Sequence, residues 1–160
     1  MDFDEFFRSE RDALIRLCWL LTLDRDAAAD VAQEAMTRAW SSWDQLSSEG
    51  SNPAAWVRVV ATNLARSRWR RLSRAARLDP TARPEPQRYP VSDPELLGAL
   101  DSLAPRQREA IVLRYWADLK LEDCADAMGV SVGSVKRHLV RARGRLGELI
   151  DSSAIEELTL

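Results

Sequence analysis

Residues 119–146 have the sequence LKLEDCADAMGVSVGSVKRHLVRARGRL, which decides the fold of the second half of the chain. Gly129 follows a short apolar face and stands where a helix C-cap needs a left-handed residue. Ser131 then occupies the place of an N-cap. The next apolar residues recur at steps of three and four, which puts them on one buried helix face: Val132, Val135, Leu139, Ala142 and Leu146. The stretch predicts a helix-turn-helix whose second helix starts at Ser131.

The second helix of this motif is strongly basic. No acidic residue occurs between Ser131 and Gly147, and the cations of this stretch are Lys136, Arg137, Arg141, Arg143 and Arg145. A helix with cations on its outer face and a tight turn before it suits a DNA major groove. The alternative is an ordinary helical hairpin with a solvated basic face. We prefer DNA binding because cap, glycine, spacing and charge agree.

Charge is segregated along the chain rather than large overall. The 160 residues are 46% hydrophobic and carry a net charge of −2, which allows one domain or two small ones. Residues 1–50 contain five arginines and eleven acidic residues, whereas residues 53–78 contain seven arginines and no acidic residue. We expect two such segments to face different partners.

The arginine-rich segment 53–78 is predicted to be a helix with an inner apolar stripe that includes Trp56. Arginine can hold phosphate or stack on a base, and asparagine can read base edges. The polar side chains expected to project outward are Arg58, Asn63, Arg66, Arg70, Arg74 and Arg77. Core packing remains the alternative for each tryptophan, and a solvated face remains the alternative for the arginines.

Nearly the whole sequence has helical periodicity, and no alternating strand pattern occurs, so we expect an all-α fold of two small helical domains. Asp2 with Glu5 predicts a capping box, and Asn52-Pro53 predicts a helix start. Residues 44–52 are expected to be a loop, and residues 79–93 an extended proline-rich linker. The predicted helices cover about 3–22, 27–43, 53–76, 94–102, 105–117 and the helix-turn-helix.

Several function classes are disfavoured by composition. Cys18 and Cys124 are far apart and His138 is the single histidine, so we expect neither a metal site nor a cofactor. No nucleophile–base pair and no phosphate-binding glycine loop is present, which argues against an enzyme. The first residues lack an apolar signal core, and no apolar run approaches about twenty residues. We therefore expect a cytoplasmic protein without membrane insertion.

Three segments of the chain together resemble one family, the extracytoplasmic-function (ECF) sigma factors of bacterial RNA polymerase. Residues 24–43 resemble sigma regions 2.1–2.2, residues 55–71 resemble regions 2.3–2.4, and residues 103–146 resemble region 4. The tripeptide Trp56-Val57-Arg58, near the start of its predicted helix, and the pattern around GVSVGSVK most resemble an actinobacterial, SigE-like subgroup. The resemblance implies sigma region 2 over 1–78, a linker over 79–93, sigma region 4 over 94–148 and a tail over 149–160.

By this resemblance the protein directs core polymerase to promoters. The −35 element would be read from the recognition helix by Ser131, Ser134, Lys136, Arg137, Arg141 and Arg145. The −10 element would be read and melted by Trp56, Arg58, Asn63, Arg66, Arg70 and Arg71. The core polymerase would be bound by Asp30, Gln33, Glu34 and Arg38.

The implied partners are promoter DNA, the β′ clamp and β flap of core polymerase, and an anti-sigma factor. One departure from the family pattern concerns the helix-turn-helix: Lys120 replaces the usual capping Ser or Thr, so we expect Asp118 to cap instead. Arg106 and Arg108 are expected to add phosphate contacts.

Two other functions remain open. A stand-alone helix-turn-helix regulator would bind an operator without polymerase, as a dimer with a ligand or phosphoacceptor domain. A sigma-like decoy would bind polymerase or an inhibitor without reading DNA. The intact basic helices argue against the decoy.

Overall fold

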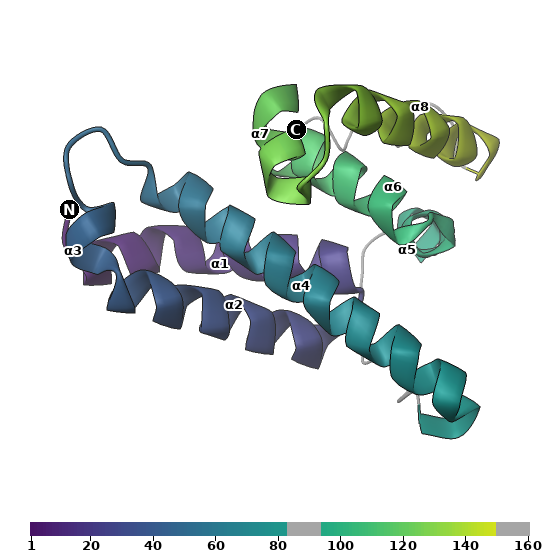
Figure 1. Cartoon of the computed structure of the whole chain (residues 1–160), viewed down its shortest axis with the longest axis horizontal. Coiled ribbons are helices and arrows are strands. Elements are labelled where there is room, and N and C mark those ends of the chain that lie inside the picture. Colours follow the sequence, from purple (N-terminus) through teal and green to yellow (C-terminus); the bar gives the residue numbers. More distant parts are fainter. Residues whose placement is uncertain (83–93, 150–160) are drawn as a thin grey trace. The chain divides into compact units, whose positions relative to one another are not determined.

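A computed structural model describes residues 1–82 and 94–149 (Figure 1). The chain divides into two compact units, Met1–Arg88 and Tyr89–Leu160. Every regular element in the described ranges is helical, which confirms the all-α prediction. The remaining residues of the predicted linker and tail, 83–93 and 150–160, lie outside the described part of the chain.

The first unit is built from α1 (Phe3–Thr22), α2 (Arg25–Ser41), α3 (Trp43–Leu46) and α4 (Pro53–Leu78). Each of the three long helices of this unit has a side-chain cap at its start. Asp2 and Glu5 form a reciprocal capping box, with bonds of 2.8 and 3.2 Å. The Asp24 and Asn52 side chains accept backbone N–H groups at 2.8 and 3.0 Å.

Alanines let the three long helices of this unit approach closely. The buried face of α2 is dominated by Ala27, Ala28, Ala32, Ala35 and Ala39. Larger side chains from α1 fill the space that these small residues leave, among them Phe6, Leu14, Leu17 and Leu20. α1, α2 and α4 therefore form one core.

Only the first half of α4 belongs to that core. Its buried residues are Val57, Ala61, Thr62 and Ala65, and none of the residues in 66–78 is buried. Figure 1 shows this second half running past the ends of α1 and α2. The core thus holds α4 by its first half and leaves the arginine-rich half in solvent.

The second unit is a helix-turn-helix supported by two further helices. Its elements are α5 (Pro94–Ser102), α6 (Pro105–Ile111), the π-helical turn η2 (Val112–Trp116), α7 (Leu121–Met128) and α8 (Val132–Leu149). Gly129 caps α7 with φ of 65°, and Ser131 accepts the Ser134 N–H at 3.2 Å. Val135, Leu139, Ala142 and Leu146 are buried, whereas Val132 is only half-buried. The predicted turn and helix register are confirmed.

Two segments that the sequence predicts to lack helix each contain a short helical turn. The predicted loop 44–52 begins with α3, a single turn whose Trp43 ring lies 5.3 Å from the Phe3 ring and 5.0 Å from the Phe6 ring. The predicted linker starts with a short 3₁₀ turn at Pro80–Ala82. Aromatic packing across the chain and local backbone bonds override the loop-like composition at these places.

The end of the predicted helix 105–117 also differs. From Val112 to Trp116 the backbone widens to a π turn, and the Ala117 N–H donates to the Val112 carbonyl at 3.0 Å. Asp118 does not cap α7: Lys120 is the N-cap residue and makes no side-chain cap bond. Asp118 instead has φ of 50° and pairs with Arg114 at 3.7 Å. The π turn places Asp118 away from the start of α7.

The two glycines at 129 and 144 give opposite stability predictions. Gly129→Ala should lower the free energy of unfolding by about 1–2 kcal/mol, because a side chain strains the left-handed cap. Gly144→Ala should raise it by about 0.5–1 kcal/mol, because Gly144 lies within α8 and an added Cβ meets open space. Urea unfolding followed by circular dichroism measures both. Equal effects of the two substitutions would contradict the cap assignment.

Candidate nucleic-acid interface

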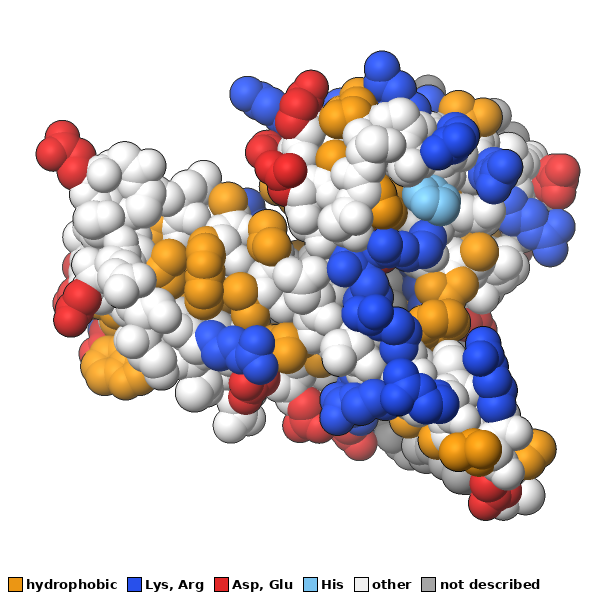
Figure 2. Space-filling view, viewed as in Figure 1, with side chains coloured by type: hydrophobic (Ala, Val, Ile, Leu, Met, Phe, Trp, Pro, Cys, Tyr) orange, Lys and Arg blue, Asp and Glu red, His pale blue; other side chains and the backbone are white. Residues whose placement is uncertain are grey.

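The outer face of α8 is lined with exposed cations. Lys136, Arg137 and Arg141 are exposed, on the side of α8 away from its buried residues. Figure 2 shows basic side chains gathered along α8. Among the described residues, Lys136 and Arg141 form no ion pair with a carboxylate. Their charge is therefore available to an anionic ligand.

The first turn of α8 contains a continuous chain of side-chain hydrogen bonds. The Ser131 hydroxyl donates to Ser134 Oγ at 3.1 Å, and Arg137 Nη2 donates to the same Ser134 Oγ at 2.9 Å. Three residues that the sequence assigns to DNA binding thus form one row, which begins at the N-terminal end of α8.

The last predicted cations of α8 have partners within the unit. Arg145 pairs with Glu148 at 3.4 Å, and the Arg143 guanidinium lies 5.3 Å from the centre of the Tyr115 ring. The Arg114 guanidinium contacts the same ring at 5.7 Å. Arg143 therefore helps to hold η2 against α8.

Arg106 and Arg108, which the sequence assigns to phosphate contacts, have partners within the second unit. Arg106 donates to Glu109 and to the Met128 carbonyl, both at 2.9 Å, and so ties α6 to the end of α7. Arg108 is buried and lies 4.0 Å from Asp101. Neither guanidinium is presented to solvent in the way that Lys136 and Arg141 are.

Val140 was not among the residues predicted from the sequence. It lies between Arg137 and Arg141 on the outer face and is 67% exposed. An apolar side chain in this position can contact a thymine methyl group in the major groove. The sequence contained the signal, because Val140 lies outside the three- and four-residue spacing of the buried face.

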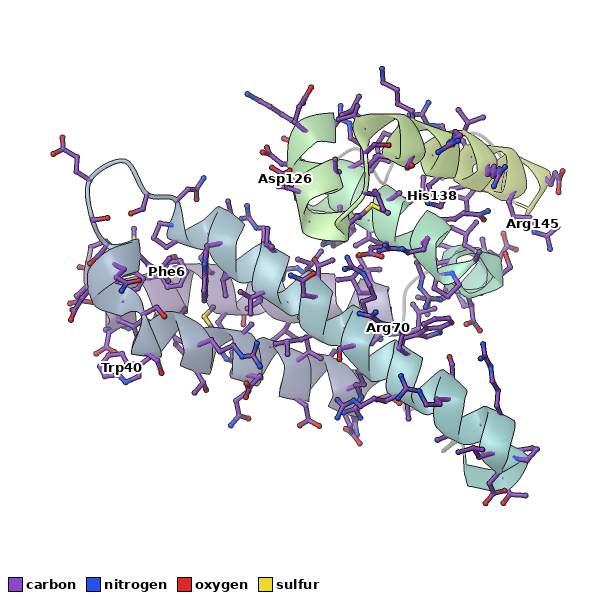
Figure 3. All side chains as sticks on the ribbon, in the orientation of Figure 1. Phe6, Trp40, Arg70, Asp126, His138 and Arg145 are labelled. Carbon is purple, nitrogen blue, oxygen red and sulfur yellow. The ribbon has the colours of Figure 1, made fainter. Side chains whose placement is uncertain are left out.

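The pKa of His138 is lowered from its ordinary value. Partial burial is the main cause, and the charges of Arg106, Arg141 and Arg137 add to it, while Glu109 opposes it. Figure 3 labels His138 on α8. Neutral imidazole is therefore the favoured form in the folded unit at neutral pH.

This shift predicts a pH-dependent stability. Below about pH 6.5 the unfolded chain takes up a proton at His138 that the folded unit resists, so stability falls as the pH decreases. His138→Gln should lessen the decrease in unfolding free energy between pH 7 and pH 5.5. Urea unfolding across that range measures the difference. Parallel pH profiles for the variant and the parent would contradict the assignment.

The second basic surface is the outer face of α4. Arg66 donates to the Asn63 Oδ1 atom at 3.1 Å, which leaves the Asn63 amide N–H₂ group to meet an acceptor. Arg70 and Arg71 are exposed and form no ion pair within the described ranges. Trp69 is 39% exposed beside them, and Trp56 is half-buried. Figure 2 shows cations gathered over this part of α4, and Figure 3 labels Arg70 there.

Two arginines of α4 pair with acids of the same unit. Arg58 Nη2 donates to Glu10 on α1 at 3.1 Å, with both side chains mostly buried. Arg68 lies 3.7 Å from Asp30 on α2. Arg58, assigned to DNA from the sequence, therefore has a structural partner 48 residues away.

We predict that the Glu10–Arg58 pair stabilises the first unit. Glu10→Ala and Arg58→Ala should each lower the unfolding free energy by about 1 kcal/mol, because each leaves a mostly buried charge without its partner. The double variant should lose less than the sum of the single losses. Urea unfolding measures the unfolding free energy of the parent and the three variants. Arg71→Ala, which removes an exposed arginine of the same helix, is the control. A stable Arg58→Ala variant with strongly reduced promoter binding would instead assign Arg58 to DNA.

A polar edge and an apolar groove lie together on α1 and α2. Asp30, Gln33, Glu34 and Arg38 are all exposed along α2, and Glu34 pairs with Arg38 at 2.8 Å. A groove of about 480 Å³ runs beside this edge. It is lined mainly by apolar side chains, including Phe3, Phe7, Leu14, Ile15, Met36 and Trp40.

Gln33 belongs both to this edge and to the groove lining. Trp40 is 62% exposed at the end of α2, and its ring lies 5.0 Å from that of Phe3 (Figure 3). Exposed apolar area rimmed by polar side chains is typical of a protein-binding surface.

The two cysteines are buried, and burial raises their pKa values, to about 12 for Cys18 and about 11 for Cys124. Both thiols are therefore protonated at neutral pH and poor nucleophiles. In the ranges 1–82 and 94–149, no group of three or more His, Cys, Asp or Glu residues is placed to hold a metal ion.

Among the described helices, none combines the length and apolar character that a membrane span requires.

One unit with a helix-turn-helix and a basic outer face, joined in the same chain to a second helical unit with its own basic helix, is typical of a DNA-binding transcription factor. Two family models match the chain: sigma-70 region 2 over residues 6–75, and sigma-70 region 4 over residues 94–146. The chain belongs to the sigma-70 family, in the group of ECF RNA polymerase sigma factors.

Relatives support both the group and the subgroup. The RNA polymerase sigma-E factor of Streptomyces avermitilis is 32% identical over 100% of this chain and 91% of its own length. The ECF sigma factor EcfG of Rhodopseudomonas palustris is 32% identical over 86% of this chain and 78% of its own length. The predicted family and its SigE-like character are confirmed.

Two solved structures have the same fold as this chain. The sigma factor RpoE from Bartonella quintana, in complex with the anti-sigma factor NepR, has a TM-score of 0.77 and 29% identity. The match covers 92% of this chain and 96% of that one. CnrH, in complex with the cytosolic domain of CnrY, has a TM-score of 0.63 and 25% identity over 92% and 86% of the two chains.

Proposed function

We propose that this sigma factor reads a bipartite promoter with the outer faces of α8 and α4. The observation that carries the proposal is the row of exposed Lys136, Arg137 and Arg141, with half-buried Ser134 at its start, on a recognition helix capped by Ser131. The first turns of such a helix reach base edges, so Lys136 and Arg137 would contact bases of the −35 element, with Ser134 beside them in the same turns. Arg141 and Arg145 would hold phosphates.

The outer face of α4 would bind the −10 element and its opened strand. Asn63, Arg66, Arg70 and Arg71 form the polar surface, and Trp56 is a partly exposed aromatic residue two turns before Asn63 on the same helix. Because the Asn63 carbonyl oxygen is occupied by Arg66, Asn63 would act as a hydrogen-bond donor to a base or phosphate acceptor. Sigma region 2 would span 1–78, the linker 79–93 and sigma region 4 94–148.

Core polymerase would dock on α2. The exposed edge of Asp30, Gln33, Glu34 and Arg38 supplies polar contacts, and the groove beside it supplies apolar area for a helix of the β′ clamp. The β flap would bind the second unit. Charged rim residues would direct docking while the apolar groove supplies most of the binding free energy.

An anti-sigma factor is the proposed inhibitor, because the similar sigma factor RpoE of Bartonella quintana is bound to the anti-sigma factor NepR. We place the protein in the cytoplasm, where core polymerase and promoters meet. We assign it no catalytic activity of its own, because its proposed role consists of binding.

Run-off transcription tests the proposal. Bacterial core polymerase and genomic DNA fragments are incubated with and without the protein, and the start sites are mapped. Discrete new start sites that require the protein support promoter recognition. Polymerase binding without initiation would indicate a decoy, and operator binding without polymerase affinity would indicate a stand-alone regulator.

Lys136→Ala and Arg145→Ala should affect transcription in different ways. Removing Lys136 should cost about 1–3 kcal/mol at one promoter position and relax sequence preference there. Removing Arg145 should weaken all promoters alike and reduce the salt dependence of binding. Binding to a panel of −35 duplexes with single base-pair changes measures both. A uniform loss for Lys136→Ala would contradict its assignment to a base.

A further inference from the structure

We propose that Ser134 is a positioning residue, which fixes the Arg137 guanidinium for a guanine of the upstream promoter element. This inference rests on the proposed function of α8 and assigns separate roles within its first turns. Its basis is the row of hydrogen bonds from Ser131 through Ser134 to Arg137.

The hydrogen-bonding capacity of Ser134 is largely used inside the protein. Its Oγ atom accepts the Ser131 hydroxyl at 3.1 Å and Arg137 Nη2 at 2.9 Å. A hydroxyl has two acceptor lone pairs and one donor hydrogen. Both acceptor sites are thus occupied, and only the O–H of Ser134 remains for DNA.

Ser131 anchors the row to the backbone. Its Oγ atom accepts the Ser134 N–H at 3.2 Å and thereby caps α8. The side chain of Ser134 is half-buried, whereas Arg137 is exposed. The row therefore leads from a fixed helix end to a cation in solvent, and Ser134 is its middle member.

Arg137 keeps most of its donors for a ligand. A guanidinium has five N–H groups in a planar fork, and the bond to Ser134 uses one of them. The commonest base-specific contact of such a fork is a bidentate bond to guanine O6 and N7. Holding the fork in one orientation before binding reduces the rotamer entropy that DNA binding would otherwise remove.

Lys136 and Arg141 are the natural comparison, because neither makes a side-chain hydrogen bond within the described ranges. They can follow a phosphate in several rotamers. Arg137 is thus the cation of α8 whose geometry favours discrimination between bases, and Ser134 is the residue that supplies that geometry.

A double-mutant cycle on the holoenzyme tests the proposal. Ser134→Ala, Arg137→Ala and the double variant are assembled with core polymerase. Binding is measured on promoter fragments that carry single base-pair changes in the −35 element recovered by run-off transcription. Ser134→Ala keeps the backbone N–H that Ser131 caps, so α8 should remain folded, and thermal unfolding checks this.

We expect Ser134→Ala to weaken binding about three- to tenfold. It should lose preference at the same G·C pair as Arg137→Ala, and the double variant should bind no more weakly than Arg137→Ala. Ser134→Thr, which retains a hydroxyl, should restore that preference. Arg141→Ala is the control. In the double variant of Ser134→Ala and Arg141→Ala, the fold-losses in binding of the two single variants should multiply, because the two side chains act independently.

Two results would overturn the positioning role. In the first, Ser134→Ala loses preference at a different base pair from Arg137→Ala. In the second, the fold-losses in binding of Ser134→Ala and Arg137→Ala multiply in full in the double variant. Ser134 would then contact DNA directly. A parent holoenzyme without preference among the fragments would instead overturn the proposed function of α8, and this inference with it.

Discussion

Burial of one narrow face of a long helix determines which cations each unit presents. In α8, burial of Val135, Leu139, Ala142 and Leu146 fixes the rotation of the helix. Lys136, Arg137 and Arg141 must then face solvent. In α4 the buried residues end at Ala65, so the arginines that follow have no core to enter. The same packing that stabilises each unit therefore creates its anionic-ligand surface.

Repulsion among cations is the main cost of this arrangement. α4 carries seven arginines and no acidic residue, and acids from the neighbouring helices offset only part of that charge. Glu10 approaches Arg58 in the half of α4 that packs in the core, and Asp30 approaches Arg68 shortly after the last buried residue. Farther along, Arg70 and Arg71 have no such neighbour in the described residues. An anionic partner such as DNA relieves that repulsion.

Local signals made much of the fold predictable. Asp2, Asn52, Gly129 and Ser131 act within one turn of their own position, so their roles as caps follow from the sequence alone. No local pattern marks the π turn at 112–116 or the helix at 43–46. Trp43 of that helix packs on Phe3 and Phe6, and Tyr115 of the π turn contacts Arg143.

In the candidate site, too, some residues could be predicted from local sequence and others could not. The exposed row of α8 follows from helical periodicity, and so does the edge of α2. The partner of Arg58 could not be predicted, because Glu10 is distant in sequence and on another helix. The structural roles of Arg106 and Arg108 were missed for the same reason. Charge alone does not distinguish a cation that binds DNA from one that holds two helices together.

Tethered cleavage of promoter DNA would test the central claim most directly, namely that α8 and α4 face two different promoter elements. The buried thiols of Cys18 and Cys124 resist labelling, so single cysteines at Val140 and Ser67 can each carry a hydroxyl-radical probe. In the holoenzyme, the probe on α8 should cut only the upstream element, and the probe on α4 only the downstream element. Cuts by both probes in one element would contradict the account.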